Sequence, residues 1–316
     1  MIQNIIRNLL TYLSFPQNLI LENVSLKQKK IMSKVLIMSK KNITFKEKKL
    51  KTHSIFSKKV LELIEKKKLN DFLKKPFIQK MFFVHNRFYI VILLIELFLS
   101  KDWILWKKLL KESNIGGPIR FFCYRNSSGN KIRQVYHLKK LSESTTINLK
   151  KIKNIIEIGG GYGCMPLIFN KINKNINYYI FDTKEVCLLQ YYYLKAHNLS
   201  VSCGIQNKKI SLISNINELK KISKIKNLKN NNTLVLSNWA YSEMPISLRK
   251  KIEKLILGFE LILMSFQSTF ENIDNKIFFK KFSKKFKKGL RIKFLKIKAM
   301  NFLNSNKFRK KDIYLQ

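Results

Sequence analysis

The second half of the sequence predicts an α/β fold, on three observations. From about residue 150, short apolar runs alternate with stretches of helical periodicity. Four of the chain's 10 glycines fall between residues 159 and 163, directly behind the first of these runs. The second run ends on Asp182. Alternation of this kind produces βαβ units, and therefore a mainly parallel sheet with helices on both faces.

The elements of this sheet can be placed in order along the chain. Five apolar runs are expected to form strands: 154–159, 177–182, 209–214, 233–238 and 260–265. Residues 184–198 and 247–258 lie between them and have the apolar spacing of helices. Near the end of the chain, 290–299 and 312–316 predict a closing antiparallel pair of strands.

Residues 1–112 predict a helical N-terminal region. Apolar residues recur at helical spacing through 57–75, with lysines between them. The run 81–110 predicts two helices broken near Ser100–Asp102, with Ser100 capping the second. Gly116–Pro118 and Asn126–Asn130 are loop signals, so 113–149 is expected to be a linker and substrate-side segment. Residues 150–316 are then the ligand-binding domain.

The chain is strongly basic, with 63 Lys and Arg against 19 Asp and Glu and a net charge of +44. Such a charge is typical of proteins that bind nucleic acid or anionic membranes. However, Lys, Asn, Ile and Phe are all abundant and all have A/T-rich codons, and the lysines are spread along the chain. Codon composition is therefore the favoured explanation of the charge.

Cysteine spacing and hydropathy indicate a cytoplasmic protein, with peripheral contact at the inner face of a membrane left open. The four cysteines form no CxxC pair, which predicts neither a zinc site nor a disulfide framework. The longest apolar run, 88–99, is 12 residues long and contains Glu96. A membrane span needs about 20 residues, so this run is expected to be a buried helix.

The glycine-rich turn predicts a ligand site. Gly159, Gly161 and Gly163 follow Glu157 with the spacing E-x-G-x-G-x-G, and glycines after a first strand allow a sharp turn and close approach to a ligand. The dinucleotide fingerprint has its last glycine one residue later, where this chain has Cys164. An acidic residue before the turn suits a cationic ligand with an amino group, such as S-adenosylmethionine.

Asp182 extends this interpretation to the next strand. A carboxylate at the tip of the second strand can accept hydrogen bonds from two ribose hydroxyls, although Asp182 could also cap the following helix. We expect the cofactor to contact Glu157, Gly159, Gly160, Gly161, Tyr162, Gly163, Asp182 and Asn238.

Three segments resemble the bacterial sugar O-methyltransferases: IIEIGGGYG (155–163), YYIFDTKEVCLLQYYYLKA (178–196) and LSNWAYSEMP (236–245). The likeness extends over about residues 112–280 and is absent from the N-terminal third. One departure is Asp182-Thr183-Lys184-Glu185, where the family has Asp-Leu-Pro-Glu. The resemblance implies a Rossmann-like class I methyltransferase sheet, S-adenosylmethionine as donor, and a sugar hydroxyl as acceptor in surface polysaccharide synthesis.

The loop after the fourth strand is expected to face the transferred methyl group, because ligands bind beyond the carboxyl ends of such strands. Glu243 is the loop's one carboxylate and the first candidate for the general base, with His137 as the second. A structural role for Glu243, as a cap or ion-pair partner of the next helix, is an equal alternative. Trp239 and Tyr241 are candidates for stacking on a sugar ring, or for core packing.

Two other functions stay open. Asn238-Trp239-Ala240-Tyr241 resembles the Asn-Pro-Pro-Tyr motif of methyltransferases that act on base amines, although both prolines are missing, so a nucleic-acid methyltransferase is the second hypothesis. A non-catalytic binding protein of the same fold is the third. Residues 276–288 predict a basic amphipathic helix that either covers the sheet or lies on anionic lipid.

Overall fold

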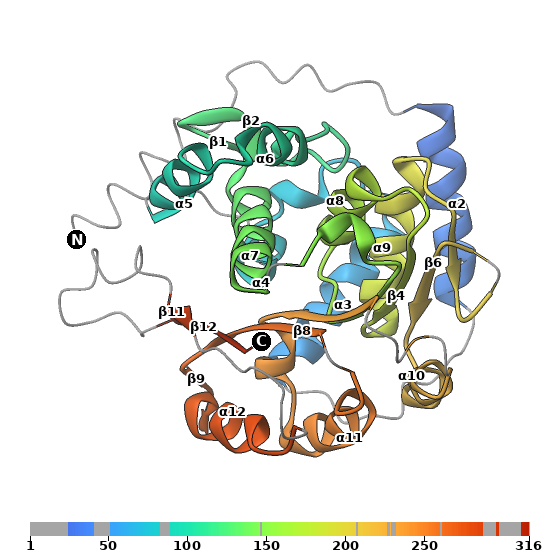
Figure 1. The fold of residues 1–316 in the computed structure, drawn as a ribbon. Coiled ribbons are helices and arrows are strands. Elements are labelled where there is room, and N and C mark those ends of the chain that lie inside the picture. Colours follow the sequence, from blue (N-terminus) through green and yellow to red (C-terminus); the bar gives the residue numbers. More distant parts are fainter. Residues whose placement is uncertain are drawn as a thin grey trace.

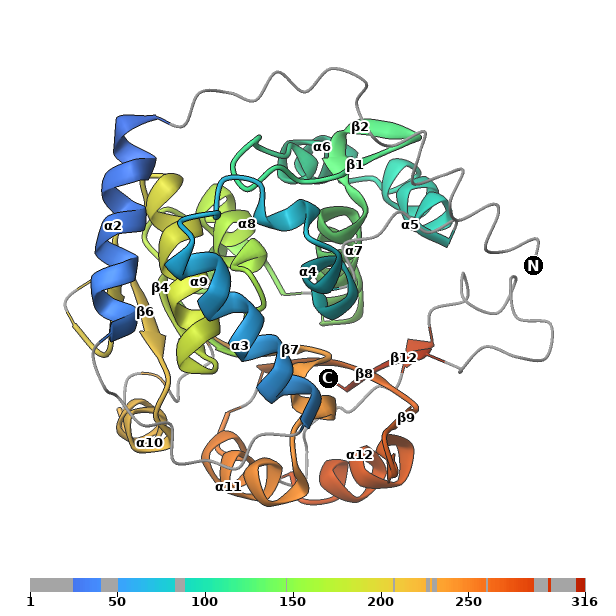
Figure 2. The same ribbon diagram turned by 180° about the vertical axis from the view of Figure 1, so that it is seen from behind.

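The central element is a mixed sheet in which the first strand in chain order lies near the middle (Figures 1 and 2). The computed structural model describes residues 25–40, 51–82, 89–145, 147–206, 208–225, 228, 232–259, 261–286, 295–296 and 311–315. Within these residues the strand order is β11-β12-β8-β7-β3-β4-β6-β5. The strands are β3 (Asn154–Ile158), β4 (Asn177–Phe181), β5 (Val201–Cys203), β6 (Ile210–Ile213), β7 (Thr233–Asn238), β8 (Leu261–Gln267), β11 (Leu295–Lys296) and β12 (Lys311–Leu315).

The direction of these strands confirms the α/β prediction. Six neighbouring strands of the sheet are parallel: β8, β7, β3, β4, β6 and β5. The strands β12 and β11 extend the sheet beyond β8 in antiparallel orientation. All five expected strands are present, and the closing antiparallel pair is found at the two predicted segments, with β12 beginning one residue before 312. The short β5 was not predicted. From β3 the chain moves to β4 on one side and later returns to β7 on the other, which creates a switch point between β3 and β7.

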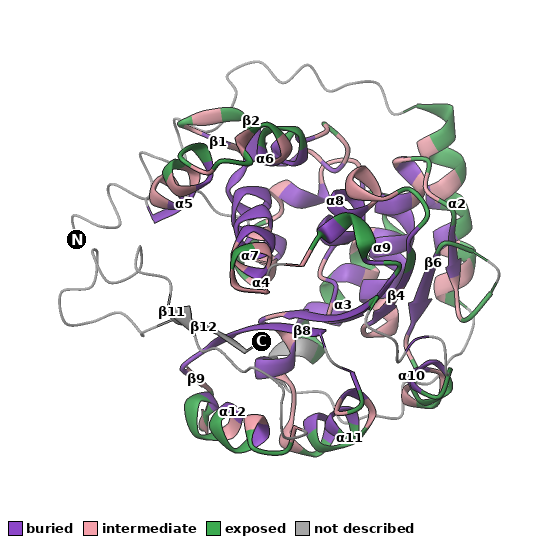
Figure 3. Cartoon of the chain, viewed as in Figure 1, coloured by how far each residue is buried: buried purple, intermediate pink, exposed green. Residues whose placement is uncertain are grey.

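Alternate residues of the strands enter two separate hydrophobic cores. Ile155 of β3 belongs to the core beneath α7 (Gly129–Thr145), α8 (Cys164–Ile172) and α9 (Lys184–Ala196), whereas Ile156 belongs to the opposite one. That second core is covered by α10 (Ile216–Ser223), α11 (Ile246–Ile256) and α12 (Asn275–Ser283). A parallel sheet buried on both faces needs strands that are apolar on both sides, and β8 is buried along its whole length (Figure 3).

The α12 helix overlaps the predicted basic segment 276–288, beginning at Asn275 and ending at Ser283, and packs against the sheet. Phe279 stacks on Phe266 of β8 with ring centroids 3.9 Å apart, and Phe282 is also buried. The lysines lie toward solvent. Of the two roles open for this segment, the contacts therefore support coverage of the sheet.

The N-terminal third is helical where it is described, as predicted. Its helices are α2 (Leu26–Lys40), α3 (Lys51–Glu65), α4 (Pro76–Phe82), α5 (Tyr89–Phe98) and α6 (Trp103–Leu110), with a 3₁₀ turn at Phe72–Lys74. The helices α2 and α3 pack on α9, and α5 and α6 pack on α7. No described helix is both long enough and apolar enough to cross a bilayer.

Two local predictions in this region were wrong. The continuous helix 57–75 ends at Glu65, because Lys67 adopts a positive φ of 52° that an α-helix does not permit. The cap of α6 is at Asp102, although the Ser100 hydroxyl does accept a hydrogen bond from the Trp106 indole N–H at 3.1 Å.

The segment 113–149 has more regular structure than its loop signals indicated. A hairpin of β1 (Arg120–Phe121) and β2 (Tyr124–Ser128) leads directly into α7. The reason is a buried ion pair: the Lys131 ammonium donates to the Glu112 carboxylate at 2.6 Å, and the Ser128 hydroxyl donates to the same carboxylate at 2.7 Å. Asn126–Asn130, read as a loop from composition, is therefore the junction of a strand and a helix.

We predict that Lys131→Met destabilises the protein by about 3–5 kcal/mol, because it leaves the Glu112 carboxylate buried without its cation. Denaturant unfolding of the purified variant measures the change. The matched control is Lys75→Met, which breaks a half-exposed ion pair with Asp71 and should cost at most about 1 kcal/mol. Equal effects of the two substitutions would show that the Glu112–Lys131 pair is not desolvated.

Candidate cofactor-binding site

The glycine turn after β3 is shaped by a lack of space. Gly159 has a φ of 77°, and a Cβ added to it would lie 2.0 Å from the Cβ of Ala240 in the loop after β7. Gly163 has a φ of 96° and forms the N-cap of α8. Both positions therefore need glycine, and the turn brings the backbone up to the end of β7.

Glu157 lies at the floor of this turn and is buried within β3. Its carboxylate accepts a hydrogen bond from the Tyr178 hydroxyl on β4 at 2.8 Å. Burial, together with the nearby charge of Asp182, raises the pKa of Glu157 to about 8. A carboxyl group with such a pKa is a strong candidate to face a cation, because a positive ligand would favour its ionised form.

Asp182, at the tip of β4, is the second carboxyl group of the turn. It accepts hydrogen bonds from the Thr183 backbone N–H at 2.8 Å and from the Gln190 amide at 3.0 Å, and the backbone N–H groups of Gly160 and Gly161 also point to it. Burial nevertheless raises its pKa to about 7. The Asp182 carboxylate thus holds the glycine turn in place and still lines the pocket.

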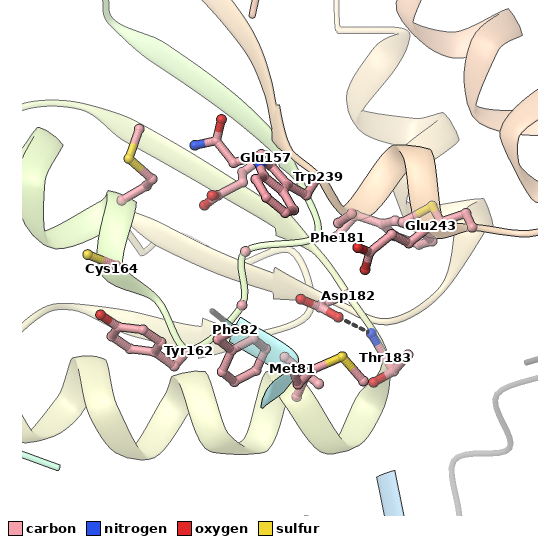
Figure 4. Close-up of a pocket in the computed structure, with 18 of the residues that line it drawn as sticks. Met81, Phe82, Glu157, Tyr162, Cys164, Phe181, Asp182, Thr183, Trp239 and Glu243 are labelled. Atoms are coloured by element: carbon pink, nitrogen blue, oxygen red, sulfur yellow. Dashed lines mark hydrogen bonds between the residues drawn. The ribbon is translucent and has the colours of Figure 1, made fainter. Parts of the chain in front are cut away.

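The loop after β7 forms the facing wall. Trp239 has a φ of 77°, which is rare for a bulky residue and is typical of functional turns. Glu243 lies in the 3₁₀ turn Ala240–Glu243, lines the pocket and accepts a hydrogen bond from the Gln267 amide at 3.0 Å. The N-cap of α11 is Pro245, so Glu243 does not cap that helix. In Figure 4 the carboxylates of Glu157, Asp182 and Glu243 surround one pocket.

Arg249 of α11 holds this loop from behind. Its guanidinium donates to the backbone carbonyl of Met244 at 2.7 Å, to the carbonyl of Ser242, and to the Asn275 side chain. Asn238, at the end of β7, donates to Gln134 of α7 and accepts from the Ser265 hydroxyl. The loop is thus held on both sides before any ligand binds.

Helix α7 contributes a wall that motif spacing did not reveal. Asn130, Arg133 and Gln134 all line the pocket. The Arg133 guanidinium donates to Asn130 at 3.0 Å and lies 4.7 Å from the centre of the Trp239 ring. The loop signals at 126–130 predicted a linker where α7 begins. No local sequence pattern marks Arg133 as a pocket residue.

The N-terminal helices close the pocket from a third side. Phe56 and Ser57 of α3 and Met81 and Phe82 of α4 line it. The Phe82 ring packs against the Tyr162 ring beside the glycine turn, with ring centroids 5.9 Å apart. Their distance in sequence from the glycine motif explains why sequence reasoning missed them.

Nine of the twelve predicted site residues line this pocket: Glu157, Gly159, Gly160, Gly161, Tyr162, Asp182, Asn238, Trp239 and Glu243. Gly163 caps α8 and is not part of the lining. Tyr241 is turned to the opposite side, where its hydroxyl donates to the Arg249 carbonyl and its ring packs on Phe279 and Phe282. Tyr241 therefore cannot stack on a ligand in the pocket.

His137, the second candidate base, is also separate from the pocket. It is fully buried on α7, and burial together with the charge of Arg133 holds its pKa well below the ordinary range. Of α7, Asn130, Arg133 and Gln134 line the pocket and His137 does not, so His137 is not placed to act as a base there.

No protein-family model and no curated protein matches the chain. Several solved methyltransferases are similar to it in structure. The methyltransferase domain of bacterial CtHen1 is 16% identical, with 56% of this chain and 93% of that one covered and a TM-score of 0.38. Human N-acetylserotonin methyltransferase, solved in complex with SAM, is 11% identical (59% and 55% covered, TM-score 0.28).

The mitomycin 7-O-methyltransferase MmcR is 10% identical, with 99% of this chain and 96% of that one covered and a TM-score of 0.34. Identities this low concern the fold alone, and TM-scores below 0.5 carry no conclusion about function. The sugar O-methyltransferase family suggested by the motifs stays a prediction.

We predict that Glu157 and Asp182 make the ligand-free protein lose stability as pH rises from about 7 to about 8. Both carboxyl groups have raised pKa values in the folded state, so together they hold more protons in the folded protein than in the unfolded chain. That excess stabilises the fold and is lost as pH passes the folded pKa values. Below about pH 7 the lowered pKa values of His137 and His197 act in the opposite direction, so the window lies above it. Denaturant unfolding across this range measures the slope.

Glu157→Gln should flatten the slope, because it removes the larger of the two proton linkages, whereas the exposed Glu65→Gln should leave it unchanged. A slope that Glu157→Gln leaves unchanged would mean that the Glu157 carboxyl group is already ionised in the folded protein.

Proposed function

We propose that the protein is an S-adenosylmethionine-dependent methyltransferase. The observation that carries the proposal is the glycine turn at the switch point, which lies between two carboxyl groups of raised pKa. A cation with a ribose satisfies both: Glu157 can neutralise the positive charge, and Asp182 can accept from ribose hydroxyls. The Thr183 hydroxyl, which lacks a hydrogen-bond partner among the described residues, adds an unused polar group to the same wall.

The residues of the pocket would have distinct roles in the reaction. When bound, S-adenosylmethionine supplies a methyl group activated by a sulfonium. The glycine turn and Asp182 hold the donor end of the pocket, and the loop after β7 presents Trp239 and Glu243 to the acceptor. Glu243 would take the proton of the acceptor hydroxyl through its carboxylate. The apolar side chains of Phe56, Met81 and Phe82 would exclude water from the pocket.

The proposed acceptor is a sugar hydroxyl, in surface polysaccharide synthesis. This part rests on the resemblance of the motifs to sugar O-methyltransferases. One face of the Trp239 indole is covered by Arg133, so a sugar would contact the other face or the ring edge. The burial of Tyr241 speaks against the base-amine alternative, which would need that ring in the pocket. A screen with labelled donor against nucleotide-sugars, glycans and RNA separates the two acceptors.

We predict one binding site for S-adenosylmethionine, and a loss of about 1.5–3 kcal/mol in binding when Asp182 is replaced by Ala, because charged hydrogen bonds to the ribose are removed. Titration calorimetry measures both. The control is Asp102→Ala, an exposed aspartate outside the pocket, which should bind like the unaltered protein. Absence of binding to the unaltered protein would rule out the proposed cofactor.

We predict that Glu243→Gln lowers turnover by about 10²–10⁴-fold, the usual contribution of a general base. The amide oxygen can still accept the hydrogen bond from Gln267, so folding and donor affinity should be nearly unchanged. Single-turnover transfer and donor titration are measured together. The matched control is Glu253→Gln, a buried glutamate on α11 outside the pocket. Normal turnover of Glu243→Gln would show that its carboxylate takes no proton.

A further inference from the structure

Helix α5 has an unusual surface for a helix at the outside of a protein. Nine of its ten residues are apolar or aromatic. A helix that is apolar all round is normally buried all round. In α5 only one side is buried, through Tyr89, Ile90, Leu93 and Leu97. The opposite side is left apolar and open.

The exposed apolar side of α5 continues across the short turn at 99–102 into α6. Leu99 is 75% exposed and Ile104 is 87% exposed, and Ile95 and Phe98 are each at least half exposed. Phe98 and Trp103 join the two helices through an edge contact with ring centroids 5.3 Å apart. We call the surface formed by Ile95, Phe98, Leu99, Trp103 and Ile104 the α5–α6 face. A contiguous exposed apolar face of this kind marks an interaction site.

The only acidic residue of α5 does not interrupt this face. The Glu96 carboxylate accepts a hydrogen bond from the Tyr136 hydroxyl at 2.8 Å and pairs with the Lys140 ammonium at 3.0 Å, both on α7. Its charge is thereby neutralised against the body of the protein, and the face keeps an uninterrupted apolar character.

Lysines border the face. Lys101 lies in the corner between the helices, and Lys107 and Lys108 follow Ile104 by three and four residues, the spacing that places side chains on one side of a helix. All three are exposed, as is Lys111 beyond the end of α6, and Asp102 is the one exposed acidic residue among them. An apolar centre with a basic border is the pattern of surfaces that lie in the interface of an anionic bilayer.

We infer that the α5–α6 face docks the protein onto an anionic membrane surface. The apolar side chains would enter the boundary between headgroups and acyl chains, while the lysines contact the anionic headgroups. Charge decides against a second copy of the chain as the occupant, since self-association would bring two sets of these lysines together. This inference is independent of the proposed methyl transfer, and it concerns a surface other than the basic helix α12.

The test is sedimentation of the full-length protein with phosphatidylcholine vesicles, with and without phosphatidylglycerol. The unaltered protein should bind the vesicles that contain phosphatidylglycerol, and salt should weaken the binding. The double variant L99S/I104S should bind about tenfold more weakly, because it removes two inserted apolar side chains. The variant K107Q/K108Q should bind these vesicles roughly fivefold more weakly for each lysine removed.

The matched control is I37S/I277S, which alters two isoleucines of α2 and α12 that are 62% and 55% exposed. It should bind like the unaltered protein. Thermal melts check that every variant is folded, and all the substituted side chains are exposed.

Three results would overturn the inference. The first is no binding of the unaltered protein to either kind of vesicle. The second is an equal loss of binding in the control, which would assign the contact to another surface. The third is a dimer in gel filtration that L99S/I104S dissociates, which would make the face an interface between two copies.

Discussion

The structure depends on one steric constraint, the contact between the carboxyl ends of β3 and β7. Gly159 and Ala240 meet so closely that a Cβ on Gly159 would lie 2.0 Å from the Cβ of Ala240. This contact brings the loop after β7 over the glycine turn and opens the pocket on the other side of the turn. Everything that lines the pocket is arranged around that junction: β4 supplies Asp182, α7 supplies Arg133, and the N-terminal helices close the remaining side.

The contact between β3 and β7 also determines the electrostatics of the pocket. The junction buries Glu157, whose carboxylate accepts a hydrogen bond from the Tyr178 hydroxyl, and places Asp182 nearby. Two carboxyl groups of raised pKa at one turn are an unfavourable arrangement in an empty protein. Such an arrangement is easier to understand where a cation completes the site, and so the electrostatics and the glycine geometry support the same class of ligand.

Sequence reasoning succeeded where a single local pattern determines the structure. The apolar runs at 154–159 and 233–238 predicted strands, and glycines in alternate positions predicted a sharp turn, in which Gly159, Gly161 and Gly163 have positive φ angles. It failed where tertiary contacts decide. Asn126–Asn130 looked like a loop because the partner that orders it, Glu112, lies outside the segment. For Tyr241 the sequence left stacking and core packing both open, because periodicity does not reveal which side of a 3₁₀ turn faces the ligand.

The packing of the N-terminal helices on α9 has a consequence for how the chain is made. The Ser57 hydroxyl donates to Glu185, 128 residues later in sequence, and α2 and α3 pack their apolar sides on the same distant helix. The helices α2 and α3 can pack on each other early, but the surface on which both of them rest is absent until α9 has been synthesised. During that interval their apolar sides are open to solvent and to other chains. We expect biosynthesis, rather than the finished fold, to be the stage at which this protein is most prone to aggregate and most in need of a chaperone.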